Sequence, residues 1–314
     1  MLDFDVTQLN QTFIDALDDP SMRKEAAEQA AEYLKSQIYE DSFMVKILPP
    51  QGIRPEQCDR DVNSPNYQVV IDKEYADVQA VTTTFRGRSD FDFVETERYA
   101  VTFRELESRE YSLTEGELRG MRQPVQNLIR HHIAYYLRKR MDEIFIGMCN
   151  AAVGASGLHL DLSAGSDDRI TPDLVNQLTD LIDEQSPKYL EATTLLMTKP
   201  QYKKINTWIQ HNTASGAGTL PGMTGGIGAD FWRDGYKYPT LFGFRLIVTN
   251  KTDLINTNEI FAFTEPEYLG HHFTFNDDRF SIEKRHKQMS WKGYRTFGAA
   301  IGNINAVAKL TLKP

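Results

Sequence analysis

The 314-residue chain carries 35 Lys and Arg against 44 Asp and Glu, a formal net charge of -9 at pH 7. Broad nucleic-acid binding requires a basic face, so this balance argues against a general DNA- or RNA-binding protein. Apolar residues make up 40% and charged residues 25%, which is typical of a folded globular protein. No run approaches the roughly 20 apolar residues of a membrane span.

The start of the chain, MLDFDVTQLN, is acidic where a signal peptide would be basic and then apolar. We therefore expect a protein that is made and kept in the cytoplasm, with one large domain or two subdomains. Cys58 and Cys149 are the two cysteines, far apart and in no metal-binding pattern. They predict two buried thiols and no disulfide scaffold.

The first third of the sequence predicts an arm followed by a long hairpin. Ser21 can cap a helix running to about Tyr39, and apolar residues recur in it at helical spacing: Met22, Ala26, Ala30, Leu34 and Ile38. Prolines at 49, 50 and 55 then predict an extended connection to a short strand, YQVVID. Residues 78–112 predict a two-stranded hairpin broken at RGRS. An isolated hairpin is marginal in water, so we expect it to lie on a neighbouring subunit.

A very long helix follows the hairpin. Thr114 and Glu117 match a capping box, and Pro124 suits the first turn of a helix that we expect to end near Ala152. About 28 residues at 1.5 Å each give a rod of roughly 42 Å. At 100° per residue, His131 and His132 point to different sides of it, so they cannot chelate one metal together. A structural helix is the better interpretation of this run.

The second half predicts a further subdomain. Thr171 caps and Pro172 starts a helix whose buried stripe is Leu174, Leu178, Leu181 and Ile182. After it come a strand in ATTLLMT, a helix in KPQYKKINTWIQHN, a Gly-rich run from 214 to 228, and strands in FGFRLIVTN and EIFAFTE. The tail from residue 279 predicts several strands that return to the beginning of the fold.

No motif in the sequence compels a catalytic, cofactor or metal site. The Gly-rich run lacks the GK[ST] ending and the strand-loop-helix context of a phosphate loop. The acidic pairs Asp167–Asp168 and Asp277–Asp278 suit solvated turns, and His271 with His272 suits a loop without a third zinc ligand. We expect no enzyme and no cofactor. A soluble enzyme with a site at the Gly-rich loop stays open as an unfavoured alternative.

The order of these parts resembles the major capsid proteins of tailed bacteriophages, whose Hong Kong phage-type fold is also used by encapsulin nanocompartments. Seven stretches carry the resemblance: YEDSFMVKILPP, residues 78–112, the long helix from Pro124, TTLLMTKPQYKKINTW, LFGFRLIVTN, EIFAFTEPEYL and GAAIGNINAVAKLTL. The resemblance implies an α+β chain with an N-terminal arm (1–66), an extended hairpin loop (67–113), a peripheral domain with a spine helix (114–165 and 275–314), and an axial domain (166–274).

The same resemblance implies a structural protein whose subunits form hexamers and pentamers and close an icosahedral head around double-stranded DNA, without sequence-specific binding and without a membrane. We expect assembly in the host cytoplasm, a place in the virion, and a separate scaffolding protein and a portal as partners; the sequence leaves the presence of decoration proteins open. An encapsulin-like compartment is the alternative within the fold. Six hairpin residues are expected to set register between subunits: Arg86, Arg88, Glu95, Glu97, Arg104 and Glu105.

Some capsid proteins of this type join their subunits through an isopeptide bond from a hairpin lysine, but this chain has no lysine between Lys73 and Lys139. We therefore predict that mature particles boiled in detergent run as a single band of monomer. A ladder of covalent multimers on a denaturing gel would contradict this expectation.

Overall fold

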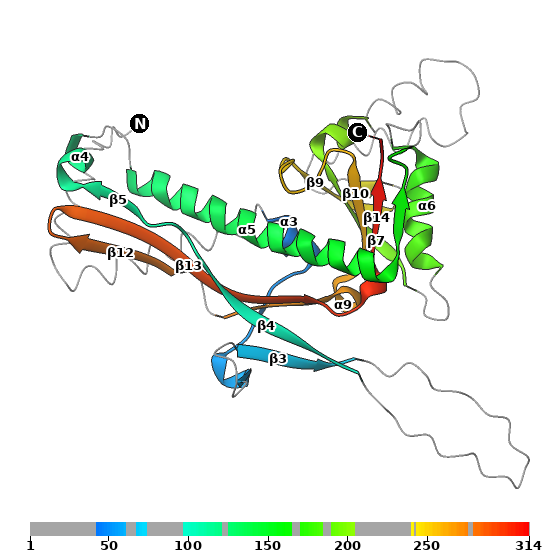
Figure 1. Ribbon diagram of the computed structural model, residues 1–314, viewed down its shortest axis with the longest axis horizontal. Coiled ribbons are helices and arrows are strands. Elements are labelled where there is room, and N and C mark those ends of the chain that lie inside the picture. Colours follow the sequence, from blue (N-terminus) through cyan, green and yellow to red (C-terminus); the bar gives the residue numbers. More distant parts are fainter. Residues whose placement is uncertain are drawn as a thin grey trace, which may run out of the picture.

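The computed structural model describes residues 42–60, 67–73, 97–120, 125–164, 170–184, 190–204, 240–241, 243–275 and 279–313. These residues form an elongated molecule with a long sheet, a long helix lying across it, and a second sheet at one end (Figure 1). None of the described helices is both long and apolar enough to cross a membrane. The α+β class predicted from the sequence is confirmed.

The first sheet is organised by one strand, β13 (Gln288–Ile301), which is 14 residues long. Antiparallel to it run β4 (Arg98–Glu107), β5 (Tyr111–Thr114), β11 (Gly270–Thr274) and β12 (Arg279–Arg285). Beyond these lie β1 (Gln51–Gly52) next to β11, and β3 (Tyr67–Asp72) and β2 (Asp59–Arg60) next to β4. Because β13 touches four strands, the tail does return to earlier parts of the chain, as predicted.

The predicted rod is α5 (Val125–Ser156), 32 residues and about 48 Å long. It follows α4 (Glu115–Gly120), whose capping box is present: the Thr114 amide and hydroxyl donate to Glu117 Oε2 at 2.9 and 2.8 Å. One side of α5 is buried against β13 and the second sheet along most of its described length: Ile133, Ala134, Leu137, Met141, Phe145, Ile146, Cys149, Ala152 and Val153. The helix ends four residues later than the sequence indicated.

The second sheet has the order β6-β14-β10-β7-β9-β8. Its strands are β6 (His159–Asp161), β7 (Ala192–Thr198), β8 (Thr240–Leu241), β9 (Phe244–Thr249), β10 (Glu259–Thr264) and β14 (Val307–Thr311). α6 (Pro172–Asp183) packs on it, with the Thr171 hydroxyl accepting from the Leu174 amide at 3.3 Å as expected of the cap. The predicted strands at 192–198, 244–249 and 259–264 are therefore confirmed.

Three sequence-based expectations are wrong. His271 and His272 lie in β11 and not in a loop, because Gly270–Thr274 pairs with β13 on one side while Gln51–Gly52 pairs on the other. The connection after residue 41 is not fully extended: Ser42 caps a short helix, α3 (Phe43–Ile47). Cys58 is half-buried rather than buried, although both thiols are free as predicted.

Several expectations fall outside the described residues. They are the helix from Ser21 to Tyr39, the Gly-rich run, the two acidic pairs, and residues 78–96 of the hairpin. The described part of that hairpin is β4, and its partner is the YQVVID strand, β3. Three further short elements are η1 (Pro55–Gln57), α9 (Pro266–Leu269) and η2 (Ile304–Ala306). Residues 199–204, the described start of the helix predicted in KPQYKKINTWIQHN, are helical.

Gly270 of β11 lies close against the backbone of β13. A Cβ atom there would lie 2.2 Å from the Ala300 carbonyl oxygen, a backbone atom that cannot move without disturbing β13. We predict that Gly270→Ala lowers the free energy of unfolding by about 1–3 kcal/mol, as overpacking does. Urea denaturation of the unassembled chain measures the loss.

Gly147→Ala is the matched control, because no heavy atom lies within 4 Å of a Cβ at that position of α5. A helical Gly→Ala change should stabilise by roughly 0.5–1 kcal/mol. Equal effects of the two substitutions would show that the strand approach at Gly270 is not limiting.

Candidate assembly elements and the Asp142 junction

The strand β4 belongs to two ladders in succession. Its residues 98–102 pair with β3, and its residues 103–107 pair with β13. The β3–β4 ribbon therefore leaves the main sheet, and Figure 1 shows it projecting away from the body. A two-stranded ribbon has little core of its own, so its base must be fixed by contacts with the rest of the molecule.

The base of the ribbon is held by a small aromatic cluster. Phe103 stacks on Phe275 with ring centroids 4.1 Å apart, and Val101 and Phe273 are buried with them. The Tyr99 hydroxyl lies 2.5 Å from Nδ1 of His271 on β11. Burial raises the pKa of Tyr99 and lowers the pKa of His271, so both are neutral at pH 7.

The same Tyr99 ring lies against Gly302. A Cβ atom at Gly302 would come within 2.7 Å of the ring, so only glycine allows this contact without a shift. The Tyr99–His271 hydrogen bond holds the ribbon to β11, and the contact between the Tyr99 ring and Gly302 holds it to the end of β13. The direction of the ribbon is therefore set by its last contacts with the body.

The structure describes three of the six hairpin residues that are expected to set the register between subunits. Arg86, Arg88 and Glu95 lie outside the described residues. Glu97 is at the ribbon, where its carboxylate accepts from Lys73 at 3.0 Å, and its side chain is exposed. Arg104 and Glu105 are exposed on the part of β4 that pairs with β13. The structure thus places Glu97 on the ribbon and the other two on the main sheet.

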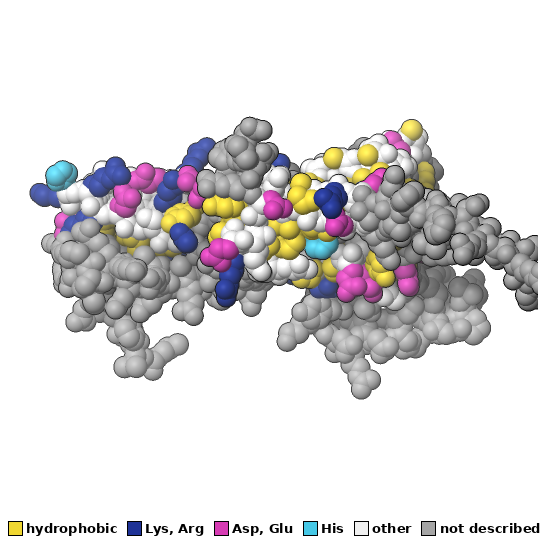
Figure 2. Space-filling view, turned by 90° about the horizontal axis from the view of Figure 1, so that it is seen from below, with side chains coloured by type: hydrophobic (Ala, Val, Ile, Leu, Met, Phe, Trp, Pro, Cys, Tyr) yellow, Lys and Arg dark blue, Asp and Glu magenta, His cyan; other side chains and the backbone are white. Residues whose placement is uncertain are grey.

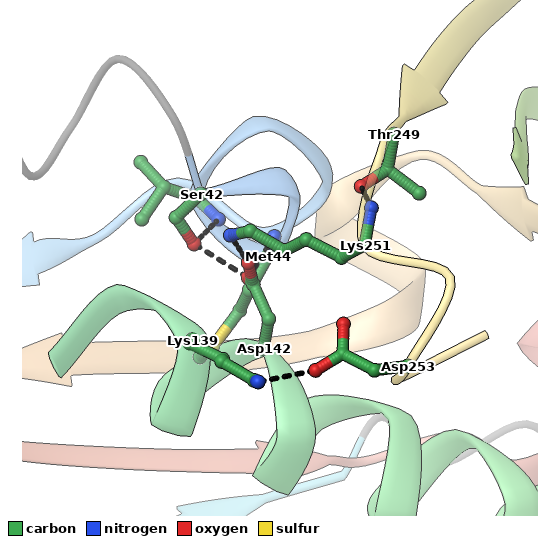
Figure 3. A network of polar contacts seen from close by, with 8 residues as sticks. Ser42, Met44, Lys139, Asp142, Thr249, Lys251 and Asp253 are labelled. Carbon is green, nitrogen blue, oxygen red and sulfur yellow. Dashed lines mark hydrogen bonds and ion pairs between the residues drawn. The ribbon is translucent and has the colours of Figure 1, made fainter. Parts of the chain in front are cut away.

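A buried carboxylate, Asp142, joins three separate parts of the chain (Figure 3). It lies on α5 and is fully buried. Its Oδ1 accepts from the Ser42 hydroxyl at 2.7 Å and from the Met44 amide at 3.0 Å. Its Oδ2 accepts from Lys251 Nζ, which follows β9, at 2.5 Å. One side chain thus connects the segment before β1, the long helix and the second sheet.

Burial and hydrogen bonding have opposite effects on the pKa of the Asp142 carboxyl. Burial raises the pKa of its carboxyl, while Lys251, the Ser42 hydroxyl and the Met44 amide act in the other direction. The ammonium of Lys251 also lies 5.6 Å from the centre of the Phe43 ring. One turn before Asp142 on α5, Lys139 pairs with Asp253, and this pairing lowers the pKa of Asp253.

A histidine holds the other end of the same segment. Nδ1 of His272 donates to the Leu48 carbonyl at 3.1 Å, and the residue is fully buried. Burial lowers its pKa to about 4, so the ring is neutral at pH 7. Ser42–Leu48 is therefore fastened at both ends by buried polar side chains, Asp142 and His272.

Sequence reasoning missed this junction. A signal was present, because Asp142 recurs with Met141, Phe145 and Cys149 on the side of a helix that the apolar pattern assigns to the core. A charged residue there needs a partner. Nothing in the local sequence identifies that partner, since Ser42 and Lys251 lie about a hundred residues away on either side.

Metal and cofactor chemistry finds no support in the described ranges. No group of three or more His, Cys, Asp or Glu that could hold an ion is present among these residues. His131 and His132 are exposed on α5. Cys149 is fully buried, which raises the pKa of its thiol.

No protein-family model matches this sequence, and no curated protein matches it either. Solved structures do match. The capsid of the cyanophage P-SCSP1u is similar with a TM-score of 0.57 at 10% identity, over 86% of this chain and 88% of that chain. The capsid of a native GTA particle is similar with a TM-score of 0.56 at 13% identity, over 86% and 90%.

A third similar structure is a virus-like particle from Pyrococcus furiosus, with a TM-score of 0.52 at 15% identity, over 91% of this chain and 99% of that one. This chain has the Hong Kong phage-type capsid fold. The match spans nearly the whole length on both sides, so the capsid fold accounts for the long helix, the projecting ribbon and both sheets together. At such low identity the likeness establishes the fold alone.

The Asp142 junction generates a testable prediction about the subunit. Asp142→Asn removes the carboxylate that pairs with the Lys251 ammonium, which is 12% exposed. We expect a loss of about 3–5 kcal/mol in the free energy of unfolding, typical of breaking a buried ion pair. Lys251→Met should also destabilise, and the double variant should lose less than the sum of the two. Urea denaturation gives all four values.

Glu143→Gln is the control on the neighbouring residue of α5. Its pair with Arg140, at 2.6 Å, is exposed on both sides, so the change should cost no more than about 1 kcal/mol. Additive losses for Asp142 and Lys251 would show that their pairing does not stabilise the junction.

Proposed function

We propose that this chain is the major capsid protein of a tailed double-stranded DNA bacteriophage, assembling as hexamers and pentamers into an icosahedral head. The observation that carries the proposal is the whole-length likeness to shell structures, among them the cyanophage and GTA capsids. Shell-forming proteins act by repeated contacts between copies of one chain.

The β3–β4 ribbon supports self-assembly independently. It leaves the main sheet, and residues 74–96 connect its two strands. Since the ribbon contributes little to the subunit core, its surface is available to a second copy. Heterologous contacts of this kind close into rings when the rotation between copies permits it. Glu97, Arg104 and Glu105 are exposed and retain their proposed role at such contacts.

The domain division expected from the sequence, a peripheral domain of 114–165 and 275–314 and an axial domain of 166–274, stays part of this proposal with shifted bounds. The first sheet with α5 would form the peripheral domain and include β11, whereas the second sheet with α6 would form the axial domain and include β6 and β14. A hydrophobic cluster between α6 and the second sheet supports an axial unit, and a larger cluster around α5 and β13 joins the first sheet to the other side of the second.

An encapsulin-like compartment is the second candidate, and the likeness to the Pyrococcus furiosus virus-like particle favours it. The two functions differ in cargo: packaged DNA for a phage head, a bound enzyme for a compartment. Scaffolding, portal and decoration proteins as partners, the virion location and assembly in a host cytoplasm all belong to the phage proposal. The soluble enzyme with a site at residues 214–228 lacks a supporting observation.

Electron microscopy with sedimentation, at several protein concentrations, tests self-assembly. Closed shells, or rings of five or six subunits, are expected. A monomer or dimer that persists at every concentration and salt, with a candidate scaffolding protein added, would overturn the proposal. DNA extracted from particles made in the native host would distinguish a phage head from a compartment.

We predict that deleting Arg86–Asp90 leaves the subunit folded and impairs assembly, because this part of the sequence belongs to the hairpin that we expect to contact a neighbour. Circular dichroism and denaturation should be unchanged within about 0.5 kcal/mol, as for surface changes, while shells or rings should fall. Loss of the monomer fold would contradict the assignment of this segment to contacts between copies.

A further inference from the structure

One side of α5 changes from buried to exposed along its length. Tyr135, Asp142 and Cys149 are spaced seven residues apart, so they lie on the same side of the helix. Asp142 and Cys149 are fully buried, whereas Tyr135 is 47% exposed. Within the described residues, the cover over this side therefore ends between Asp142 and Tyr135.

The uncovered part is aromatic and basic. Tyr136 is 51% exposed and meets the Tyr135 ring edge-on, with centroids 5.7 Å apart. Of the large apolar side chains exposed in the described part, only these two are neighbours in the chain: the others are Val70, Tyr268 and Ile304. We define the Tyr135 face as His131, His132, Tyr135, Tyr136, Lys139 and Arg140.

The stretch of sequence that contains this face carries positive charges and no negative ones. Between Glu117 and Asp142 the chain has six Lys or Arg and no Asp or Glu. Lys139 and Arg140 each pair with one carboxylate, Asp253 and Glu143, but both cations keep exposed surface. In a chain with a net charge of -9, a basic aromatic face suits an acidic partner that also has apolar groups.

The chain itself contains a segment of this chemistry. Residues 1–41 hold ten Asp or Glu and three Lys or Arg, a net charge of -7 and most of the charge of the whole protein. Their apolar residues recur at helical spacing from Met22 to Ile38, and Glu25, Glu28 and Glu32 recur beside them. The pattern combines an apolar stripe with an acidic ridge.

Position also favours this occupant. The segment joins the described chain at Ser42, whose hydroxyl donates to Asp142. Asp142 lies two turns, about 10 Å, beyond Tyr135 on the same side of α5. A helix as long as the one predicted from Ser21 to Tyr39 spans more than 25 Å at 1.5 Å per residue, so it can cover the Tyr135 face without a second subunit.

We propose that residues 1–41 dock in cis on the Tyr135 face of α5, with the acidic ridge against its cations and the apolar stripe against Tyr135 and Tyr136. The inference concerns a single subunit and does not rest on the proposed function. It assigns the acidic N-terminal segment a binding surface on its own chain and continues the cover that Ser42–Leu48 begins at Asp142.

Hydroxyl-radical footprinting of the unassembled full-length chain, read by mass spectrometry, tests the proposal. Tyr268, on α9 and 55% exposed, is the internal reference because its exposure matches that of the two tyrosines. Docking predicts that Tyr135 and Tyr136 are oxidised about tenfold more slowly than Tyr268, corresponding to a docking free energy of about 1.4 kcal/mol. Salt near 1 M, where the Debye length is about 3 Å, should weaken that protection.

A variant in which the acidic ridge carries positive charges provides the mutational test. In the full chain, Glu25→Lys with Glu28→Lys and Glu32→Lys should raise oxidation of Tyr135 and Tyr136 to the rate of Tyr268. Asp180→Lys with Glu184→Lys and Glu191→Lys changes the net charge equally at exposed sites around α6 and should leave protection intact.

Three outcomes would overturn the proposal. Tyr135 and Tyr136 could react as fast as Tyr268 in the unaltered chain. Their protection could weaken on dilution, which would identify a second copy as the occupant. Protection could also arise only when duplex DNA is added, which would make the face a phosphate-binding surface. Shell formation without protection in the unassembled chain would refute the docking alone. Protection in a chain that forms no shells at any concentration or salt, with a scaffolding protein added, would refute the proposed function alone.

Discussion

The packing of α5 on β13 is the contact on which the remainder of the fold depends. A 32-residue helix must bury one side along much of its length, and the 14-residue strand supplies a matching support. They pack tightly at Gly293, where a Cβ would lie 2.5 Å from a methyl group of Ile133. Four strands then attach to β13, so the geometry of the first sheet follows from this one contact.

The C-terminal half of α5 joins this unit to the second sheet. Phe145 lies 5.8 Å from the Phe263 ring of β10, and Cys149 and Val153 are buried in the same cluster. Apolar burial is not directional, and it fixes distance better than orientation. The Asp142 carboxylate adds direction, because its three hydrogen bonds require the Ser42 segment, the helix and Lys251 to be in place together. A buried ion pair of this kind specifies an arrangement more than it adds net stability.

The β3–β4 ribbon leaves the body from a firmly held base, where Tyr99 contacts His271 and Gly302. The start of the described chain is held in the same way, because Ser42 is hydrogen-bonded to Asp142. A rigid base gives the ribbon a defined starting direction. The hydrogen-bonding partners of these residues lie on strands and helices of the core, which hold a side chain more precisely than loops do.

The sequence by itself determined the elements whose signals are local. The long helix followed from Pro124, which suits a first helical turn, and the strands at 192–198 and 259–264 followed from short apolar runs. The capping box at Thr114 and Glu117 proved to begin the separate helix α4. The ordered set of these elements sufficed for the resemblance to capsid proteins. Each signal lies within a few residues of the structure that it specifies, which is why it could be read from sequence.

Only the tertiary structure decided where these elements meet. That His271 and His272 lie in a strand depends on β1 and β13, far away in the sequence. The division of β4 between two ladders, which creates the ribbon, depends on where β13 ends its pairing with β4. Asp142 was visible as a charge on an apolar side, but its partners lie about a hundred residues away in both directions. Such pairings arise from packing of the whole chain, and no local pattern encodes them.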